Sequence, residues 1–239
     1  MTNRWKEVWN KDKVFALSGT EKDEFAIYRE LKRLDGYDVN VGDAEAYYRR
    51  FYEETTAVWE HIRETTGVCS AYEVGCGSGA NLYLLKNRGM KVGGIDYSAS
   101  LSDIAGRVLE DRESIRTDEA VRLETDEKYD AVFSEGVFAY FPDEAYGFKV
   151  LEKMFEKATD VVILREVFDK SMKTECEAYR REMYADYDER YRGLDKVFYD
   201  REMFSRFAEE RHCRIEFSGV DNEYYWNSKY LFNCCIYKM

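Results

Sequence analysis

The feature that most constrains this chain is a glycine-rich loop, GCGSG at residues 75–79, which directly follows a short apolar run. The run at residues 70–74 has the length of a strand, and residues 81–88 after the loop have helical periodicity. A strand, a tight glycine turn and a helix in this order point backbone N–H groups and a helix N-terminus at a ligand. Because glycine has no Cβ, the ligand can approach the backbone closely. The loop therefore predicts a ligand site built on an α/β unit.

The pattern after residue 67 extends this unit, because short apolar runs alternate with helical segments. Such alternation is typical of βαβ units and a mostly parallel sheet. Strands are predicted at residues 70–74, 91–95, 114–116, 131–133 and 161–164, and helices at 81–88, 101–110 and 143–157. A helix at 201–211 and a closing strand pair at 214–217 and 230–237 complete the pattern. We expect an α/β fold with a seven-stranded, mostly parallel sheet and helices on both faces.

Two segments flank or interrupt this pattern. Residues 1–66 read as helices and predict an N-terminal helical cap, whereas the charged, tyrosine-rich residues 167–199 predict a helical lid insertion. A chain of 239 residues can form a single core, so one domain is expected over 1–239. Its parts are the cap, a ligand-binding core at 67–166, the lid, and a C-terminal helix with closing strands at 200–239.

Three acidic residues beside the loop indicate which ligand it binds. The residues at 75–80 also satisfy the dinucleotide pattern GxGxxG/A, so the loop alone leaves an NAD-type oxidoreductase open. Glu73, at the end of the first strand, would repel a pyrophosphate but attract a cation. Asp96 is placed for ribose hydroxyls, and Asp118 for the exocyclic amine of adenine. Three acids around one pocket favour S-adenosylmethionine (SAM), which carries an ammonium and a sulfonium group.

The stretches EVGCGSGANLYLLKNRGMKVGGIDYS, RTDEAVRL and KYDAVFSEGVFAYFPD resemble the class I SAM-dependent methyltransferases over about residues 70–165. The resemblance implies a Rossmann-like fold, SAM as cofactor and S-adenosylhomocysteine (SAH) as product. It also implies these cofactor-binding residues: Glu73, Gly75, Cys76, Gly77, Gly79, Asp96, Tyr97, Thr117, Asp118, Glu119 and Ser134. The sequence departs from the usual pattern of this family at two places, and both of them are turns. KATD at residues 157–160 replaces the usual Gly-Gly, and a Leu-Pro is missing because Pro142 is the only proline.

Candidate catalytic residues follow the fourth and fifth strands, because ligands in open α/β sheets bind beyond the carboxyl ends of the strands. Methyl transfer depends mostly on holding the reactants in line, and we expect no metal. A hydroxyl acceptor would need a base, and Glu135, Tyr140 and Glu166 are the candidates. Each has an alternative: Glu135 could satisfy loop N–H groups, Tyr140 could be an aromatic wall, and Glu166 could pair with Arg165 or with an arginine of the lid.

A second resemblance indicates which class of molecule accepts the methyl group. The flanks RWKEVWNK, ELKRLDGYD and NSKYLFNCCIYK resemble small bacterial methyltransferases of sugar and surface-polysaccharide modification. This resemblance implies O-methylation of a sugar, nucleotide-sugar or sugar-phosphate. Four arginines of the lid would suit a phosphorylated acceptor, although a solvated helix face balanced by Glu182, Asp186 and Glu189 is the simpler explanation. These arginines are Arg180, Arg181, Arg190 and Arg192. An N-methyltransferase of an amino sugar or small amine, a protein methyltransferase and a non-catalytic SAM-binding subunit remain as alternatives.

The composition and net charge of the chain indicate which classes of partner it can bind. The net charge of -12 and a pI near 4.9 disfavour nucleic acid, because phosphate-backbone binders present a basic face. The N-terminal residues lack the apolar core of a signal peptide, and no run of about 18 apolar residues predicts a membrane span. The six cysteines form no CxxC pair, so reduced thiols are expected. We expect a cytoplasmic protein acting on a small molecule, with its oligomeric state open.

Overall fold

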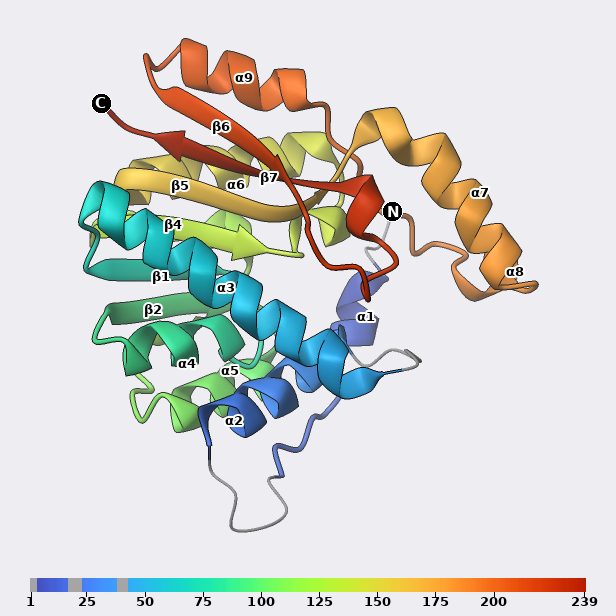
Figure 1. Cartoon of the computed structure of the whole chain (residues 1–239), viewed down its shortest axis with the longest axis horizontal. Coiled ribbons are helices and arrows are strands. Elements are labelled where there is room, and N and C mark those ends of the chain that lie inside the picture. The colour runs from blue at the N-terminus through green and yellow to red at the C-terminus, as the bar shows by residue number, and fades with distance from the viewer. Residues whose placement is uncertain (1–3, 17–22, 38–42) are drawn as a thin grey trace.

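A seven-stranded sheet forms the centre of the computed structural model, which describes residues 4–16, 23–37 and 43–239 (Figure 1). The strand order is β3-β2-β1-β4-β5-β7-β6, with β7 antiparallel to both neighbours and the first five strands parallel. The strands are β1 (Ser70–Val74), β2 (Lys91–Asp96), β3 (Ile115–Thr117), β4 (Tyr129–Glu135), β5 (Ala158–Phe168), β6 (Arg214–Gly219) and β7 (Leu231–Tyr237). The chain runs from β1 outward to β3 and then returns to β4, so the direction of winding reverses between β1 and β4.

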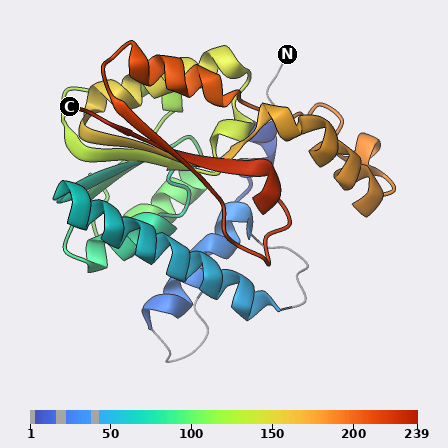
Figure 2. The ribbon, with the colours of Figure 1, turned by 45° about the horizontal axis from the view of Figure 1, so that its top comes forward.

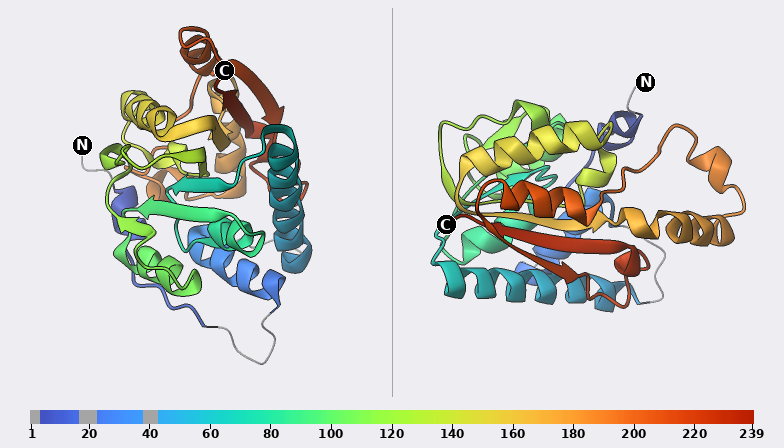
Figure 3. Two further views of the ribbon diagram at one scale, coloured as in Figure 1. Left: turned by 90° about the vertical axis from the view of Figure 1, so that its left-hand side faces the viewer. Right: turned by 90° about the horizontal axis from the view of Figure 1, so that it is seen from above.

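Helices cover both faces of the sheet and make three layers (Figure 3). One face carries α3 (Ala44–Thr66), α4 (Ala80–Asn87) and α5 (Ala99–Val108), and the other carries α6 (Glu144–Lys157) and α9 (Arg201–Glu209). Alternating side chains of β5 pack into the two hydrophobic cores, one on each face of the sheet. Val161 and Ile163 join the cluster under α3 and α4, whereas Val162 and Leu164 join the cluster under α6 and α9. The predicted fold class, a mostly parallel seven-stranded sheet between helices, is confirmed.

Side-chain caps fix where several helices begin. Asp143 accepts a hydrogen bond from the backbone N–H of Tyr146 at 2.7 Å and so starts α6. Asp43 plays the same part for α3, which ends at Gly67 in the left-handed conformation with φ 76°. These caps define the ends of the helices that pack on the sheet.

The remaining elements lie around the carboxyl ends of the parallel strands. At the N-terminal side these are α1 (Trp5–Trp9), α2 (Glu24–Lys32) and η1 (Arg33–Tyr37); residues 1–3, 17–22 and 38–42 of the expected cap lie outside the described residues. In the expected lid, α7 (Lys173–Met183) and α8 (Tyr187–Arg190) project beyond the end of β5 (Figures 1 and 2). Short helical turns complete the chain: η2 (Ala120–Arg122), η3 (Phe138–Tyr140), η4 (Lys170–Met172) and η5 (Ser228–Tyr230).

The fifth strand is longer than the sequence predicts. We expected a strand at residues 161–164 after a distinct turn at 157–160, but α6 ends at Lys157 and β5 starts at the next residue. The strand also continues through Phe168, so residues 167 and 168 of the expected lid belong to the sheet. Arg165 and Glu166, which follow the predicted strand, are buried within β5 beside polar partners. A register shift between Leu164 and Val167 accommodates them.

Candidate active site

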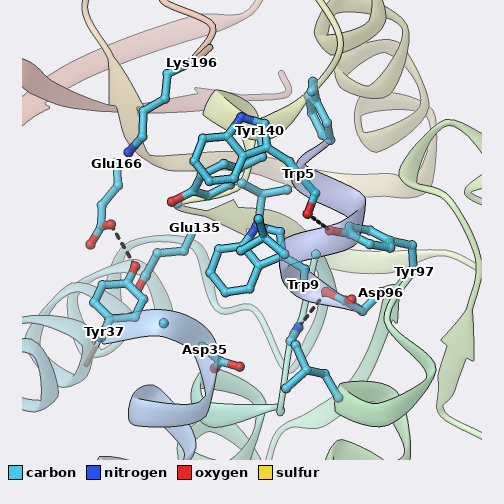
Figure 4. Close-up of a pocket in the computed structure, with 18 of the residues that line it drawn as sticks. Trp5, Trp9, Asp35, Tyr37, Asp96, Tyr97, Glu135, Tyr140, Glu166 and Lys196 are labelled. Atoms are coloured by element: carbon cyan, nitrogen blue, oxygen red, sulfur yellow. Dashed lines mark hydrogen bonds between the residues drawn. The ribbon is translucent and has the colours of Figure 1, made fainter. Parts of the chain in front are cut away.

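A cavity of about 640 Å³ lies at the carboxyl ends of β1, β2, β4 and β5, next to the point where the winding reverses (Figure 4). Open α/β sheets bind ligands at this position, and the volume falls within the usual range of about 300 to 1,000 Å³ for ligand pockets. The glycine loop, α1, η1 and the lid segment at residues 180–196 contribute its walls. The geometry therefore brings the cap, the core and the lid together around one site.

The glycine loop has no space for larger residues. Gly75 and Gly77 adopt φ angles of 77° and 52°. A Cβ on Gly75 would lie 2.4 Å from a methyl of Val137, and one on Gly77 would lie 2.4 Å from the Asp35 carboxylate. Asp35 comes from η1 and accepts a 2.7 Å hydrogen bond from the backbone N–H of Ser78. Sequence reasoning missed this contact between the cap and the loop.

Replacing Gly77 by alanine is expected to lower SAM affinity, because the new methyl would displace Asp35 and open the loop. Gly89→Ala is the matched control, since Gly89 also has a positive φ of 78° but has no atom within 4 Å of the added Cβ. Both variants should lose about 1 to 2 kcal/mol of folding stability from the left-handed backbone. Calorimetric titration with SAM measures the affinity of each variant, which should be lower for Gly77→Ala than for Gly89→Ala. Equal SAM affinity in the two variants would contradict the role given to the loop.

Glu73 presents an unpartnered carboxylate oxygen at the loop. Its side chain is buried, and Oε1 accepts a 2.8 Å hydrogen bond from the amide of Asn81. The other oxygen, Oε2, is buried without a hydrogen-bond partner. Burial raises the pKa of this carboxyl well above its usual value. A buried acceptor without a partner is costly, so the position fits a ligand that carries a cationic donor, as the ammonium of SAM does.

Asp96 lies at the end of β2 with both carboxylate oxygens already anchored. One accepts from the backbone N–H of Gly77 at 2.9 Å, and the other from that of Ser98 at 2.8 Å. These bonds hold the carboxylate at the cavity wall while leaving further acceptor capacity for ligand hydroxyls. The predicted cofactor residues that line the cavity are Glu73, Gly75, Cys76, Gly77, Asp96, Tyr97, Asp118 and Glu119.

Three other predicted cofactor residues do not line the cavity. Gly79 caps α4, and a Cβ there would meet Ala105 of α5. The Ser134 hydroxyl donates a 2.8 Å hydrogen bond to the carbonyl of Val74 between β4 and β1. Thr117 pairs with Asp96 in the sheet and has an exposed side chain. These three residues lie in the sheet and at the start of α4, outside the lining of the cavity.

The N-terminal helix α1 covers the cofactor end of the cavity. Trp5 and Trp9 pack edge-on against Tyr140, with ring centroids 4.8 and 5.4 Å apart (Figure 4). The Tyr97 hydroxyl donates to the carbonyl of Trp5 at 3.4 Å, and Lys6 forms an ion pair with Glu119. The sequence predicted a helical cap over residues 1–66, but nothing in the sequence placed this helix over the pocket. Tyr140 thus forms an aromatic wall, the alternative that its sequence position left open.

Glu135 belongs to a buried ion-pair cluster. It pairs with Lys32 at 2.5 Å and with Arg165 at 2.8 Å, and Arg165 also pairs with Glu54 at 3.1 Å. Although burial alone would raise the pKa of Glu135, Arg165 and Lys32 outweigh that effect and lower it. This differs from both sequence expectations for Glu135, a loop N–H acceptor or a base. Its charge is held by two cations, which favours a structural role.

Glu166 occupies the position suited to a base. Its backbone is left-handed, with φ 58°, and its N–H donates to the Asn233 amide oxygen at 2.9 Å. The Tyr37 hydroxyl donates to Oε2 at 2.8 Å, while Oε1 is buried without a hydrogen-bond partner (Figure 4). Burial and the charge of Glu135 raise the pKa of Glu166 to about 7. The expected pairing with Arg165 does not form. A strained backbone and a perturbed carboxyl together are typical of functional positions.

The sequence could have indicated that Lys32 and Asp35 lie on the packed side of the cap, although not which residues they contact. They lie four and seven residues after Tyr28, so all three share one stripe of the helix formed by α2 and η1. Tyr28 is completely buried, and a lysine on such an apolar stripe signals a buried partner. Lys196, which lines the lid end of the cavity, carries no comparable signal.

Comparison with known proteins agrees with this geometry. Residues 72–163 match the model of a family described as a methyltransferase domain. A search of curated sequences finds no match. The fold is similar to magnesium protoporphyrin IX methyltransferase from Synechocystis PCC 6803 with bound SAH, with TM-score 0.64 and 14% identity over 88% of this chain and 94% of that one.

Two further solved structures have different acceptors. One is CalS10, an amino pentose methyltransferase from Micromonospora echinaspora, with TM-score 0.58 and 12% identity over 80% of this chain and 95% of that one. The other is the small RNA methyltransferase HEN1, with TM-score 0.57 and 17% identity over 78% of this chain and 25% of that one. At these identities the likeness shows a shared fold and leaves the acceptor open.

The fold, the glycine loop with its acids and the matching family model define a SAM-dependent methyltransferase. Its cofactor is SAM, as expected from the acids beside the loop. Within residues 4–16, 23–37 and 43–239, no group of three or more His, Cys, Asp or Glu side chains is arranged to hold a metal ion. None of the helices that the structure describes has the length and apolar character needed to cross a membrane.

Proposed function

We propose that this enzyme transfers the methyl group of SAM to a hydroxyl of a small-molecule acceptor, with Glu166 as the general base. The observation that carries the proposal is the free, buried Oε1 of Glu166 at a cavity that also contains the glycine loop. A base must reach the proton that it removes and must have a pKa near the working pH. With a pKa of about 7, the Glu166 carboxyl meets the second condition, and its position at the cavity supports the first.

The residues around Glu166 have separate tasks in this proposal. When bound, SAM supplies an electrophilic methyl group on a sulfonium. Glu73 would accept a hydrogen bond from the ammonium, and Asp96 would bind the ribose hydroxyls. Trp9 and Tyr140 would exclude water from the reacting groups, and the Glu166 carboxylate would take the hydroxyl proton as the oxygen attacks. Holding the reactants in line provides most of the rate enhancement in such a displacement.

A sugar is the acceptor class that we favour, following the resemblance of the flanking segments to sugar-modifying methyltransferases. The amino pentose methyltransferase among the similar structures gives this class general support. An amine acceptor is disfavoured, because Arg180, Arg190 and Lys196 line the lid end of the cavity and would repel a cation. The net charge of -12 disfavours nucleic acid. We also propose a cytoplasmic location, since all six cysteines are unpaired.

The direct test is formation of SAH when the enzyme is incubated with SAM and a panel of neutral sugars, phosphorylated sugars, amino sugars and amines. We expect turnover with a hydroxyl acceptor, and mass spectrometry of the product should locate the added methyl on oxygen. A product methylated only on nitrogen would contradict the proposed chemistry.

The pH profile of this reaction should identify the base. The carboxylate form of Glu166 is required, so activity should fall as the pH drops through about 7. The hydrogen bond from Tyr37 lowers the pKa of Glu166, against the larger effects of burial and Glu135. Removal of that hydroxyl in Tyr37→Phe should therefore shift the rising limb of the profile to higher pH while preserving activity above it. An unshifted limb would assign the titration to another group.

A further inference from the structure

The cavity is electrically divided, with acids at the cofactor end and cations at the lid end. Glu73, Asp96 and Asp118 line the first end, and Arg180, Arg190 and Lys196 line the second. The buried ion-pair cluster of Lys32, Arg165, Glu135 and Glu54 does not neutralise these lid cations, because its two carboxylates are paired with its own two cations. Excess positive charge therefore faces the space where an acceptor would lie.

Arg180 is the most constrained of the three cations. Its side chain is buried, with only 5% of the residue exposed, and one terminal nitrogen donates to the Asn227 amide oxygen at 3.2 Å. Its Nε is buried without a hydrogen-bond partner. The guanidinium lies 4.7 Å from the ring centroid of Trp226, which fixes its orientation. Within the described part of the chain, no carboxylate pairs with it.

Lys196 lines the same end of the cavity and extends toward Glu166 (Figure 4). Its ammonium lies 4.4 Å from the ring centroid of Phe168 and 5.2 Å from that of Tyr140, and no described carboxylate lies within ion-pair distance. Burial and the nearby Arg180 lower the pKa of Lys196 well below its usual value. Among the described residues the ammonium has no ion-pair partner, and the charge of Glu166 offsets the effects of burial and Arg180 only in part. A bound anion would supply such a partner and complete the hydrogen bonding of Arg180.

The neighbouring Arg181 shows the contrast. It lies on the same helix, α7, but it is exposed and pairs with Asp188 at 3.1 Å and Glu177 at 3.8 Å. Its charge is thus compensated by carboxylates at the protein surface, as is common for helical arginines. On α7, the basic residue without an ion pair to any described carboxylate is Arg180, which lines the cavity, whereas Lys173 and Arg181 are paired with carboxylates.

We infer that Arg180 and Lys196, with Arg190 at the cavity mouth, form a subsite for a phosphate group of the acceptor. A guanidinium binds phosphate through two parallel N–H bonds, and a lysine adds a point charge. Several cations around one space suit a phosphate, which carries more charge than a carboxylate. The role of this phosphate in positioning an acceptor rests on the proposed function, whereas the binding itself does not. The enzyme would then methylate a phosphorylated or nucleotide-linked acceptor.

The test is calorimetric titration of the full chain with inorganic phosphate at low salt, with acetate as the carboxylate comparison. We expect phosphate to bind the wild type more tightly than acetate does. Arg180→Gln should weaken phosphate binding roughly 10- to 100-fold, since it removes a charge-assisted hydrogen bond. Arg181→Gln is the matched control and should bind phosphate like the wild type. SAM affinity should be the same in all three proteins.

The outcomes separate the inference from the proposed function. Phosphate affinity that is equal in Arg180→Gln and the wild type, tighter binding of acetate, or no phosphate binding by the wild type would overturn the subsite. Arg180-dependent phosphate binding without SAM binding would support the subsite and contradict the methyltransferase proposal. If Arg180→Gln fails to fold, Lys196→Gln takes its place with the same expected loss, and SAM titration checks its fold.

Discussion

Replacement of Glu166 by glutamine is expected to reduce kcat by about 10²- to 10⁴-fold, the range that a positioned general base contributes. Glutamine keeps the shape of the side chain and still accepts the hydrogen bond from Tyr37, but it cannot take a proton from the acceptor. SAM affinity should stay within a few-fold of the wild type, because the substitution lies away from the glycine loop. The rate measured at saturating SAM and acceptor checks this directly.

The stability of the same variant provides a control. The pKa of Glu166 is raised in the folded chain, so the fold favours the protonated, neutral form. The contribution of this group to stability is therefore lost as the pH rises above the ordinary carboxyl pKa of 4.5 toward about 7. At pH values above 7, Glu166→Gln should unfold no more readily than the wild type. Loss of turnover together with lower stability would indicate a structural role instead, and unchanged turnover would remove Glu166 as the base.

Replacement of Lys32 by methionine is expected to lower the free energy of unfolding by about 3 to 5 kcal/mol, because it leaves a buried carboxylate short of its partner. The side chains of Lys32 and Glu135 are only 3% and 1% exposed, and their charged atoms lie 2.5 Å apart. Arg165 alone would then compensate Glu135 while it also pairs with Glu54. Urea denaturation followed by circular dichroism measures the loss.

Lys91→Met supplies the matched control for this prediction. Lys91 pairs with Glu127 at 2.7 Å, but both side chains are 60% exposed. Surface pairs of this kind contribute about 0 to 1 kcal/mol, so the control should be nearly as stable as the wild type. A loss for Lys32→Met as small as that for Lys91→Met would show that the buried cluster does not hold the cap on the core.

The sheet could be predicted from the sequence because its strands are short apolar runs with turn residues between them. Local periodicity is sufficient for β1 and for the helices that follow the glycine loop. It fails at β5, where Arg165 and Glu166 look like the end of a strand. Their burial depends on Lys32, Glu54 and Tyr37, which lie more than a hundred residues earlier in the chain. No local pattern could reveal that compensation.

The candidate site, like the sheet, could be predicted only in part from the sequence. Glu73 and Asp96 lie at the carboxyl ends of their strands, and parallel topology alone brings them to one edge of the sheet. The cover formed by Trp5 and Trp9 and the loop contact of Asp35 were not predictable, because they depend on how the cap folds back over the core. The motif also implied direct contacts for residues such as Ser134, which the structure uses to join strands.

Calorimetric titration of the purified chain with SAM, SAH and NAD tests the central claim most directly. Glu73 places a buried, unpartnered carboxylate oxygen at the glycine loop, which favours a cationic ligand and opposes a pyrophosphate. We predict binding of SAM and SAH and no binding of NAD. Binding of NAD without SAM, or of none of the three, would contradict the assignment of this cavity to methyl transfer.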